Sequence, residues 1–142
     1  MRSHLGVLKQ AIKDKQKLFF LFEDDIKFKD GFWETLEFAL SELPKNFDAL
    51  HLGGFEGQRG ELAGHGIIRV KEIFGGYAIL FNAKKLKPII KLLEQDEMQC
   101  DMYYTQHQKQ GNWYRTLYNI VFHNAGISTI QGRFVDYPKL RT

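Results

Sequence analysis

An apolar segment that runs directly into three acidic residues constrains the fold of this chain more than any other feature. The sequence LFFLF at residues 18–22 is followed without a break by Glu23, Asp24 and Asp25. A short, continuous apolar run of this kind is typical of a buried β-strand, which we expect over residues 18–23. Like charges at the end of a buried strand repel one another, so they require a cation or basic partners nearby.

The order of the three acids predicts how they are divided between the two sides of the strand. Side chains alternate across a strand, so Glu23 and Asp25 are expected on one side and Asp24 on the other. In α/β sheets, ligands bind beyond the carboxyl ends of the strands, where these acids lie. Two carboxylates there would form a hard-oxygen site for Mg²⁺ or Mn²⁺. Pairing with surface basic residues such as Lys27 is the alternative, and the residues alone leave both interpretations open.

Hydrophobic periodicity predicts that strands alternate with helices along the rest of the chain. Asp30 is the expected N-cap of one helix, and Pro88 is expected to kink or restart another. The predicted elements are helix 3–15, helix 31–43, strand 48–52, a flexible glycine-rich loop at 53–66, strands 67–74 and 75–82, helix 83–95, helix 101–111 and strand 117–124. This alternation predicts a single α/β domain of 142 residues, with a mixed sheet flanked by helices and strand 75–82 in its centre.

Composition limits the classes of partner. A net charge of +3 and a pI near 8.9 suit ordinary solubility or a phosphate-bearing ligand, and they fall short of the basic footprint of a nucleic-acid-binding protein. The single cysteine, Cys100, excludes an intrachain disulfide and favours a reducing compartment. The amino terminus carries no apolar run of signal-peptide type, so we expect a cytoplasmic protein.

Several motifs taken together resemble glycosyltransferase family 25. The matching segments are SHLGVLKQAI at residues 3–12, the strand ending in EDD, FW and LP before FDALHLGG at 47–54, GGYAILFN at 75–82 and CDMYY at 100–104. This family includes bacterial lipopolysaccharide and lipooligosaccharide galactosyltransferases and the procollagen galactosyltransferases. The similarity extends over nearly the whole chain and depends on the order and spacing of the motifs.

The resemblance implies a glycosyltransferase A-type fold, an Asp-x-Asp-like metal motif and an inverting sugar transfer. The implied cofactor is Mn²⁺ or Mg²⁺. The implied donor is a nucleotide-diphosphate sugar such as UDP-galactose, and the implied acceptor is a lipooligosaccharide or another glycan. Such an acceptor would place the protein at the inner face of the membrane, as a peripheral protein.

The resemblance also assigns roles to particular residues. Glu23, Asp24 and Asp25 match the acidic motif, with Asp25 expected on the metal and Glu23 facing the metal or the ribose. Ser3 and His4 match the start of the family's first helix, whose amino terminus is suited to the donor diphosphate. An N-cap serine with a surface histidine is the alternative.

Three further residues are candidates for the site. Asp101 matches the acid of the family's later motif and is the expected base for the acceptor hydroxyl, the alternative being that it caps its helix. Arg133 in IQGRFVDY is a candidate contact to the diphosphate. His123 ends the last strand, where related folds can supply a metal ligand, but we favour a core histidine. Four aromatic residues could stack on a sugar, although we favour a core position for them: Tyr103, Tyr104, Trp113 and Tyr114.

The sequence departs from the family pattern at its start, where the first strand of the family is missing. A truncated reading frame, a fragment or a degenerate copy would each explain this, and each predicts an exposed sheet edge through which the chain could self-associate. Two other functions use the same residues. One is an inactive interaction domain. The other is a nucleotide triphosphatase, against which the lack of a G-x-x-x-x-G-K-[ST] loop argues strongly.

Overall fold

A six-stranded sheet forms the centre of the molecule. The computed structural model describes residues 2–124, 126–128 and 133–135. The strands of the sheet lie in the order β1-β8-β3-β9-β6-β5. Their bounds are β1 Leu18–Phe22, β3 Ala49–His51, β5 Glu61–Leu62, β6 Ile67–Arg69, β8 Ala78–Asn82 and β9 Trp113–Thr116. Within the described residues, β3 and β9 run parallel and the other neighbours run antiparallel, so the sheet is mixed, as expected.

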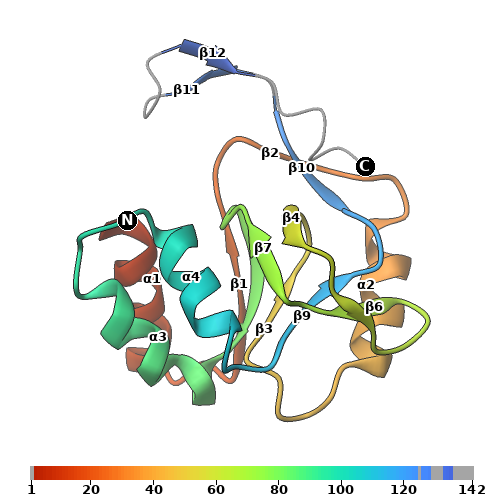
Figure 1. Ribbon diagram of the computed structural model, residues 1–142, viewed down its shortest axis with the longest axis horizontal. Coiled ribbons are helices and arrows are strands. Elements are labelled where there is room, and N and C mark those ends of the chain that lie inside the picture. Colours follow the sequence, from red (N-terminus) through yellow and green to blue (C-terminus); the bar gives the residue numbers. More distant parts are fainter. Residues whose placement is uncertain (1, 125, 129–132, 136–142) are drawn as a thin grey trace.

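Helices cover both faces of this sheet (Figure 1). One face carries α1 (Arg2–Lys13), α3 (Leu86–Leu93) and α4 (Cys100–Gln108), and the other carries α2 (Phe32–Glu42). The two faces follow from the alternation of side chains along each strand. In β8, for example, Leu80 packs on the α2 side, whereas Ile79 and Phe81 pack on the opposite side.

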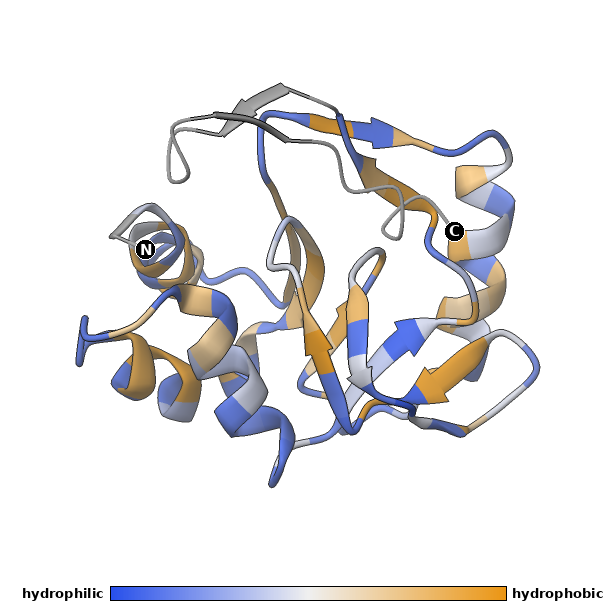
Figure 2. Cartoon of the chain, turned by 45° about the horizontal axis from the view of Figure 1, so that its top comes forward, coloured by the Kyte–Doolittle hydropathy of each residue, from blue (hydrophilic) through white to orange (hydrophobic). Residues whose placement is uncertain are grey.

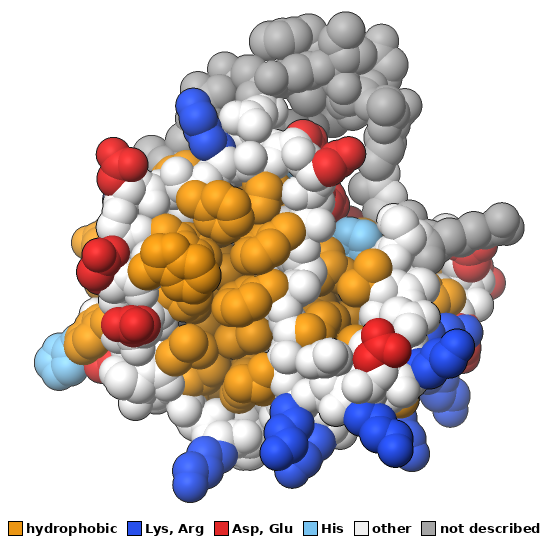
Figure 3. Space-filling view, turned by 180° about the vertical axis from the view of Figure 1, so that it is seen from behind, with side chains coloured by type: hydrophobic (Ala, Val, Ile, Leu, Met, Phe, Trp, Pro, Cys, Tyr) orange, Lys and Arg blue, Asp and Glu red, His pale blue; other side chains and the backbone are white. Residues whose placement is uncertain are grey.

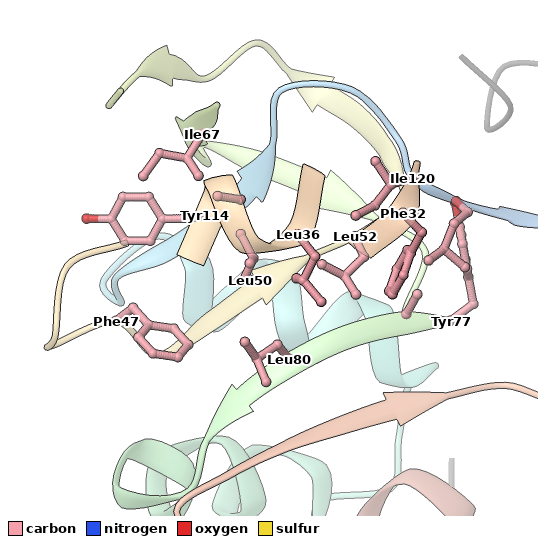
Figure 4. Close-up of a cluster of buried hydrophobic side chains, with 13 residues drawn as sticks. Phe32, Leu36, Phe47, Leu50, Leu52, Ile67, Tyr77, Leu80, Tyr114 and Ile120 are labelled. Carbon is pink, nitrogen blue, oxygen red and sulfur yellow. The ribbon is translucent and has the colours of Figure 1, made fainter. Parts of the chain in front are cut away.

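The core on the α2 side joins this helix to three strands of the sheet. Figure 4 shows Leu36 of α2 together with Leu50 of β3, Leu80 of β8 and Tyr114 of β9, all of which are buried. Figure 2 shows hydrophobic residues along the strands and hydrophilic residues in many of the connecting turns. All five residues of β8 are buried, and the strand lies between β1 and β3, so it is an inner strand next to the edge and not the middle of the sheet.

Three small antiparallel ribbons accompany the sheet in the described part of the chain. The ribbon that matters for the site pairs β2 (Ile26–Phe28), directly after the acidic segment, with β10 (Val121–His123). The second pairs β4 (Phe55–Gln58) with β7 (Glu72–Phe74), and the third pairs β11 (Gly126–Ser128) with β12 (Arg133–Val135). The β2–β10 ribbon therefore brings residues from the two halves of the chain to the end of β1.

The prediction of a flexible loop over residues 53–66 is wrong, because this segment contains β4 and β5. A buried polar network organises it. Arg115 of β9 donates hydrogen bonds to Glu56 at 2.9 Å and to the side-chain oxygen of Asn119 at 2.8 Å. Asn119 in turn bonds both the N–H and the C=O of Gly54. These contacts span about 60 residues of sequence, so a local glycine count does not reveal them.

Other element boundaries differ from the predictions for local reasons. Asp30 is not the N-cap of α2, because Gly31 holds that position in the left-handed region at φ 77°. The expected interruption near Pro88 is present as a restart and not as a kink: a short 3₁₀ turn (Ala83–Lys85) precedes α3, and the proline lies in the first turn of α3, where its missing N–H costs nothing. The predicted strand 67–74 is divided into β6 and β7, and β9 was missed. Among the described residues, no helix is both long and apolar enough to cross a bilayer.

Candidate metal centre

Three side chains meet beyond the end of β1. Glu23, Asp25 and His123 each offer one ligand atom, and these atoms all lie within 4.8 Å of one another. The His123 Nδ1 atom is 3.2 Å from an Asp25 carboxylate oxygen, and its Nε2 atom is 3.7 Å from Glu23 Oε2. The His123 side chain is 16% exposed and that of Asp25 is 54% exposed, so the cluster is open to solvent on the Asp25 side.

Backbone hydrogen bonds fix the positions of all three residues. The β1–β8 ladder continues past the last strand residue, because the Glu23 N–H donates to the Tyr77 C=O at 2.9 Å. The Asn124 N–H donates to the Asp25 C=O at 2.8 Å. His123 pairs in register with Ile26, the residue after Asp25. The central sheet therefore positions one carboxylate, and the β2–β10 ribbon positions the other carboxylate and the imidazole.

His4 lies behind Glu23 and orients it. The His4 side chain is buried, with Nδ1 2.9 Å from the Tyr104 hydroxyl and Nε2 3.3 Å from Glu23 Oε1. Gly76 makes room for this arrangement, since a Cβ atom there would lie 3.2 Å from His4 and 3.1 Å from the Tyr104 ring. Close packing of the His4 and Tyr104 rings against the backbone therefore explains why residue 76 is a glycine.

The contact between His4 and Glu23 is an ion pair. Burial of the His4 ring opposes its protonation, but hydrogen bonds to Cys100 and Glu23 raise the pKa of His4 to about 9. The hydrogen bond from His4 is the main cause that lowers the pKa of Glu23 below its ordinary value. Both groups are therefore charged at neutral pH, and His4 supplies part of the compensation that the acidic segment requires.

The cluster fits a divalent cation of borderline hardness. Carboxylates suit Mg²⁺ and Mn²⁺, whereas an imidazole ligand favours transition metals over Mg²⁺. A donor set of two carboxylates and one imidazole therefore fits Mn²⁺ better than Mg²⁺. His4 would act as an outer-shell partner that holds the Glu23 carboxylate in a fixed orientation.

The other candidate residues of the amino-terminal part, Ser3, His4 and Asp24, lie outside the cluster of ligand atoms. Asp24 is exposed in the turn between its two neighbours and is not part of the cluster. Ser3 is exposed in the first turn of α1. The alternative of a surface histidine is wrong for His4, which the end of β1 and the side of α4 enclose.

Asp101 lies in the first turn of α4, outside the metal cluster but on the same helix as Tyr104. The N-cap of this helix is Gln99, so the alternative that Asp101 caps it is wrong. Asp101 is three residues before Tyr104, and side chains at this spacing share a helix face. Its Oδ1 atom is buried and has no hydrogen-bond partner among the described residues, which leaves this oxygen available as an acceptor.

The remaining candidates from the sequence analysis are the four aromatic residues, His123 and Arg133. The favoured core interpretation of the four aromatic residues is confirmed, since Tyr103, Tyr104, Trp113 and Tyr114 are all buried. His123 is partly buried and lies beside Glu23 and Asp25, so the favoured core position gives way to the alternative of a metal ligand, which stays a prediction. The backbone of Arg133 belongs to β12, and the position of its side chain is outside the described part of the structure.

No family model matches the chain, and no curated protein matches it significantly.

Replacing His4 with Gln is expected to remove a pH-dependent part of the free energy of unfolding. Because folding raises the pKa of His4 from 6.5 to about 9, its protonation stabilises the fold fully below pH 6.5. This stabilisation falls by about 1.4 kcal/mol per pH unit as the pH rises toward the folded pKa. Urea denaturation measures the free energy of unfolding of the wild type and of His4→Gln. The difference between the two should therefore be smaller at about pH 9 than at about pH 6, by roughly 3 kcal/mol.

His65→Gln is the matched control, because His65 is exposed. The difference in the free energy of unfolding between His65→Gln and the wild type should change far less over the same pH range. If the difference in the free energy of unfolding between the wild type and His4→Gln stays constant with pH, the ion pair between His4 and Glu23 is contradicted.

Proposed function

We propose that this chain is a metal-dependent glycosyltransferase that moves a sugar from a nucleotide-diphosphate donor, such as UDP-galactose, to a glycan acceptor. The cluster of Glu23, Asp25 and His123 carries the proposal, because it brings three ligand atoms within 4.8 Å at the end of a sheet strand. The resemblance of the sequence motifs to glycosyltransferase family 25 supplies the substrate class, with a lipooligosaccharide as one such acceptor.

The cation held by these three residues would be Mn²⁺. When bound, such an ion supplies positive charge that stabilises a departing diphosphate. His4 contributes by fixing the Glu23 carboxylate and by keeping that carboxylate ionised. The first turn of an α-helix has backbone N–H groups without intrahelical partners, so the first turn of α1, which contains Ser3, would suit an anion.

Asp101 is the proposed base for the acceptor hydroxyl. A single-step inverting transfer requires a group that accepts the hydroxyl proton on the side opposite the leaving group. The unpartnered carboxylate oxygen of Asp101 supports this role. The helix that carries Asp101 also carries Tyr104, which bonds His4, and His4 bonds Glu23, so this helix contacts the metal cluster through His4.

Asp25→Asn is expected to weaken Mn²⁺ binding. The substitution removes one of three ligands, and its effect should be at least as large as the roughly 10- to 100-fold loss that follows removal of an outer-shell partner. Paramagnetic broadening of backbone amide signals during a Mn²⁺ titration measures this affinity. In the wild type, residues 23–25 and 121–124 should broaden first.

Asp24→Asn is the matched control, because it removes the same charge from the adjacent exposed residue without removing a ligand. It should weaken binding by less than a few-fold, in line with the small effect of an exposed charge. Equal losses in the two variants, or equal broadening at unrelated surface acids, would refute a built site and favour an inactive interaction domain.

Asp101→Asn is expected to lower the rate of sugar transfer by about two to four orders of magnitude while nearly preserving the affinity for the donor. The measurement is transfer from UDP-galactose to a lipooligosaccharide acceptor with Mn²⁺, alongside calorimetric titration of the donor. Asp96→Asn, in the loop before α4, is the control and should keep the full rate. A fully active Asp101→Asn variant would remove Asp101 from the mechanism.

A further inference from the structure

Among the strands that the structure describes, β1 is an edge strand whose outer backbone groups point away from the sheet. It lies first in the strand order and pairs with β8 on its inner side. The bonds from Glu23 N–H to Tyr77 and from Ala83 N–H to Lys17 show which residues face β8. Because hydrogen-bonding direction alternates along an antiparallel strand, Leu18, Phe20 and Phe22 direct their N–H and C=O groups outward.

The side chains of these outward-bonding residues are also exposed. Leu18, Phe20 and Phe22 are 49%, 38% and 39% exposed, although all three are large and apolar. They belong to a wider apolar surface, because the Phe22 ring contacts Phe28, and Trp33 nearby on α2 is 68% exposed. Figure 3, which views the molecule from behind, shows hydrophobic side chains gathered over one face.

The strand lacks the features that normally protect a sheet edge. Natural edge strands carry charged residues, prolines or bulges, or they are very short. The five residues of β1 include no charge and no proline, and its pairing with β8 is regular over all five positions. The opposite edge of the sheet, β5, is protected by its length of two residues.

We propose that two copies of this chain associate through antiparallel pairing of their β1 edges, with a two-fold axis at Phe20. In this register Phe20 pairs with Phe20 of the second copy, and Leu18 pairs with Phe22 of the second copy. These are the residues with outward backbone groups, so each pair exchanges both of its N–H···O=C bonds. The two central sheets become one continuous sheet.

The charges that flank β1 favour this register, and they favour a second copy of the same chain as the partner that pairs with the β1 edge. Basic residues precede the strand and acidic residues follow it, in the sequence KQKLFFLFEDD at residues 15–25. Antiparallel pairing about Phe20 places Lys17 of each chain directly opposite Glu23 of the other. Opposite charges facing each other across a non-hydrogen-bonded pair stabilise antiparallel strands, and both residues retain exposed surface.

The two-fold pairing of the β1 edges also limits the assembly to two copies. A two-fold contact uses the β1 edge of both chains at once, so no second β1 edge is left for growth. The short β5 edge offers little backbone for a further contact. The expected product is a dimer.

Sedimentation velocity over loading concentrations of about 1 to 200 µM tests the association, because a dimer becomes populated with concentration. Lys17→Glu places two acidic pairs across the interface and should weaken dimerisation by roughly 10- to 30-fold. Lys91→Glu makes the same charge change at an exposed position on α3 and should leave dimerisation unchanged.

A second pair of variants tests the axis position. Phe20→Lys places two like charges at the two-fold axis and should give a monomer at every concentration. Leu62→Lys is its control at the opposite edge, where Leu62 is 73% exposed, and should still dimerise. Phe20 is also exposed, so circular dichroism should show both variants folded.

Amide hydrogen exchange distinguishes edge pairing from stacking of apolar faces. Edge pairing predicts that the amides of Leu18, Phe20 and Phe22 become protected as concentration rises, whereas those of Phe19 and Leu21, bonded to β8, are protected at all concentrations. A wild type that stays monomeric, or a dimer in which Leu18, Phe20 and Phe22 exchange freely, would overturn the proposal.

Discussion

The β1–β8 ladder is the interaction on which the candidate site depends. Its last bond, from the Glu23 N–H to the Tyr77 C=O, holds the first acid of the acidic segment beside the start of β8. The chain then turns and enters the β2–β10 ribbon, where His123 is held opposite Ile26. Because backbone pairing fixes both sides of the turn, the ligand atoms of Glu23, Asp25 and His123 come together without long flexible connections.

Two histidines contact the acidic residues that follow the apolar strand, and His4 supplies positive charge there. His4 pairs with Glu23 from the buried side, and His123 lies between Glu23 and Asp25 on the side of the ribbon. The two have different chemical environments. His4 is buried among Tyr104, Cys100 and Glu23, whereas the partly buried His123 contacts the more exposed Asp25.

The sequence predicts those parts of the fold and site that depend on local pattern. The apolar run of β1, the fully buried β8 and the shared side of Glu23 and Asp25 all follow from alternation and composition. His123 could not be placed, because its pairing with Ile26 joins residues 97 positions apart and no periodicity encodes it. The strands within residues 53–66 were missed for the same reason, since Arg115 and Asn119 organise that segment from a distant part of the chain.

The central claim is that Glu23, Asp25 and His123 form one cation site. Anomalous diffraction from crystals of the protein grown with Mn²⁺ tests it directly, because the signal locates the metal without reference to any assumed ligand. The claim predicts one dominant peak, about 2.0 to 2.6 Å from a carboxylate oxygen of each acid and from a ring nitrogen of His123. The absence of a peak there, or a stronger peak at an unrelated acidic surface, would contradict it.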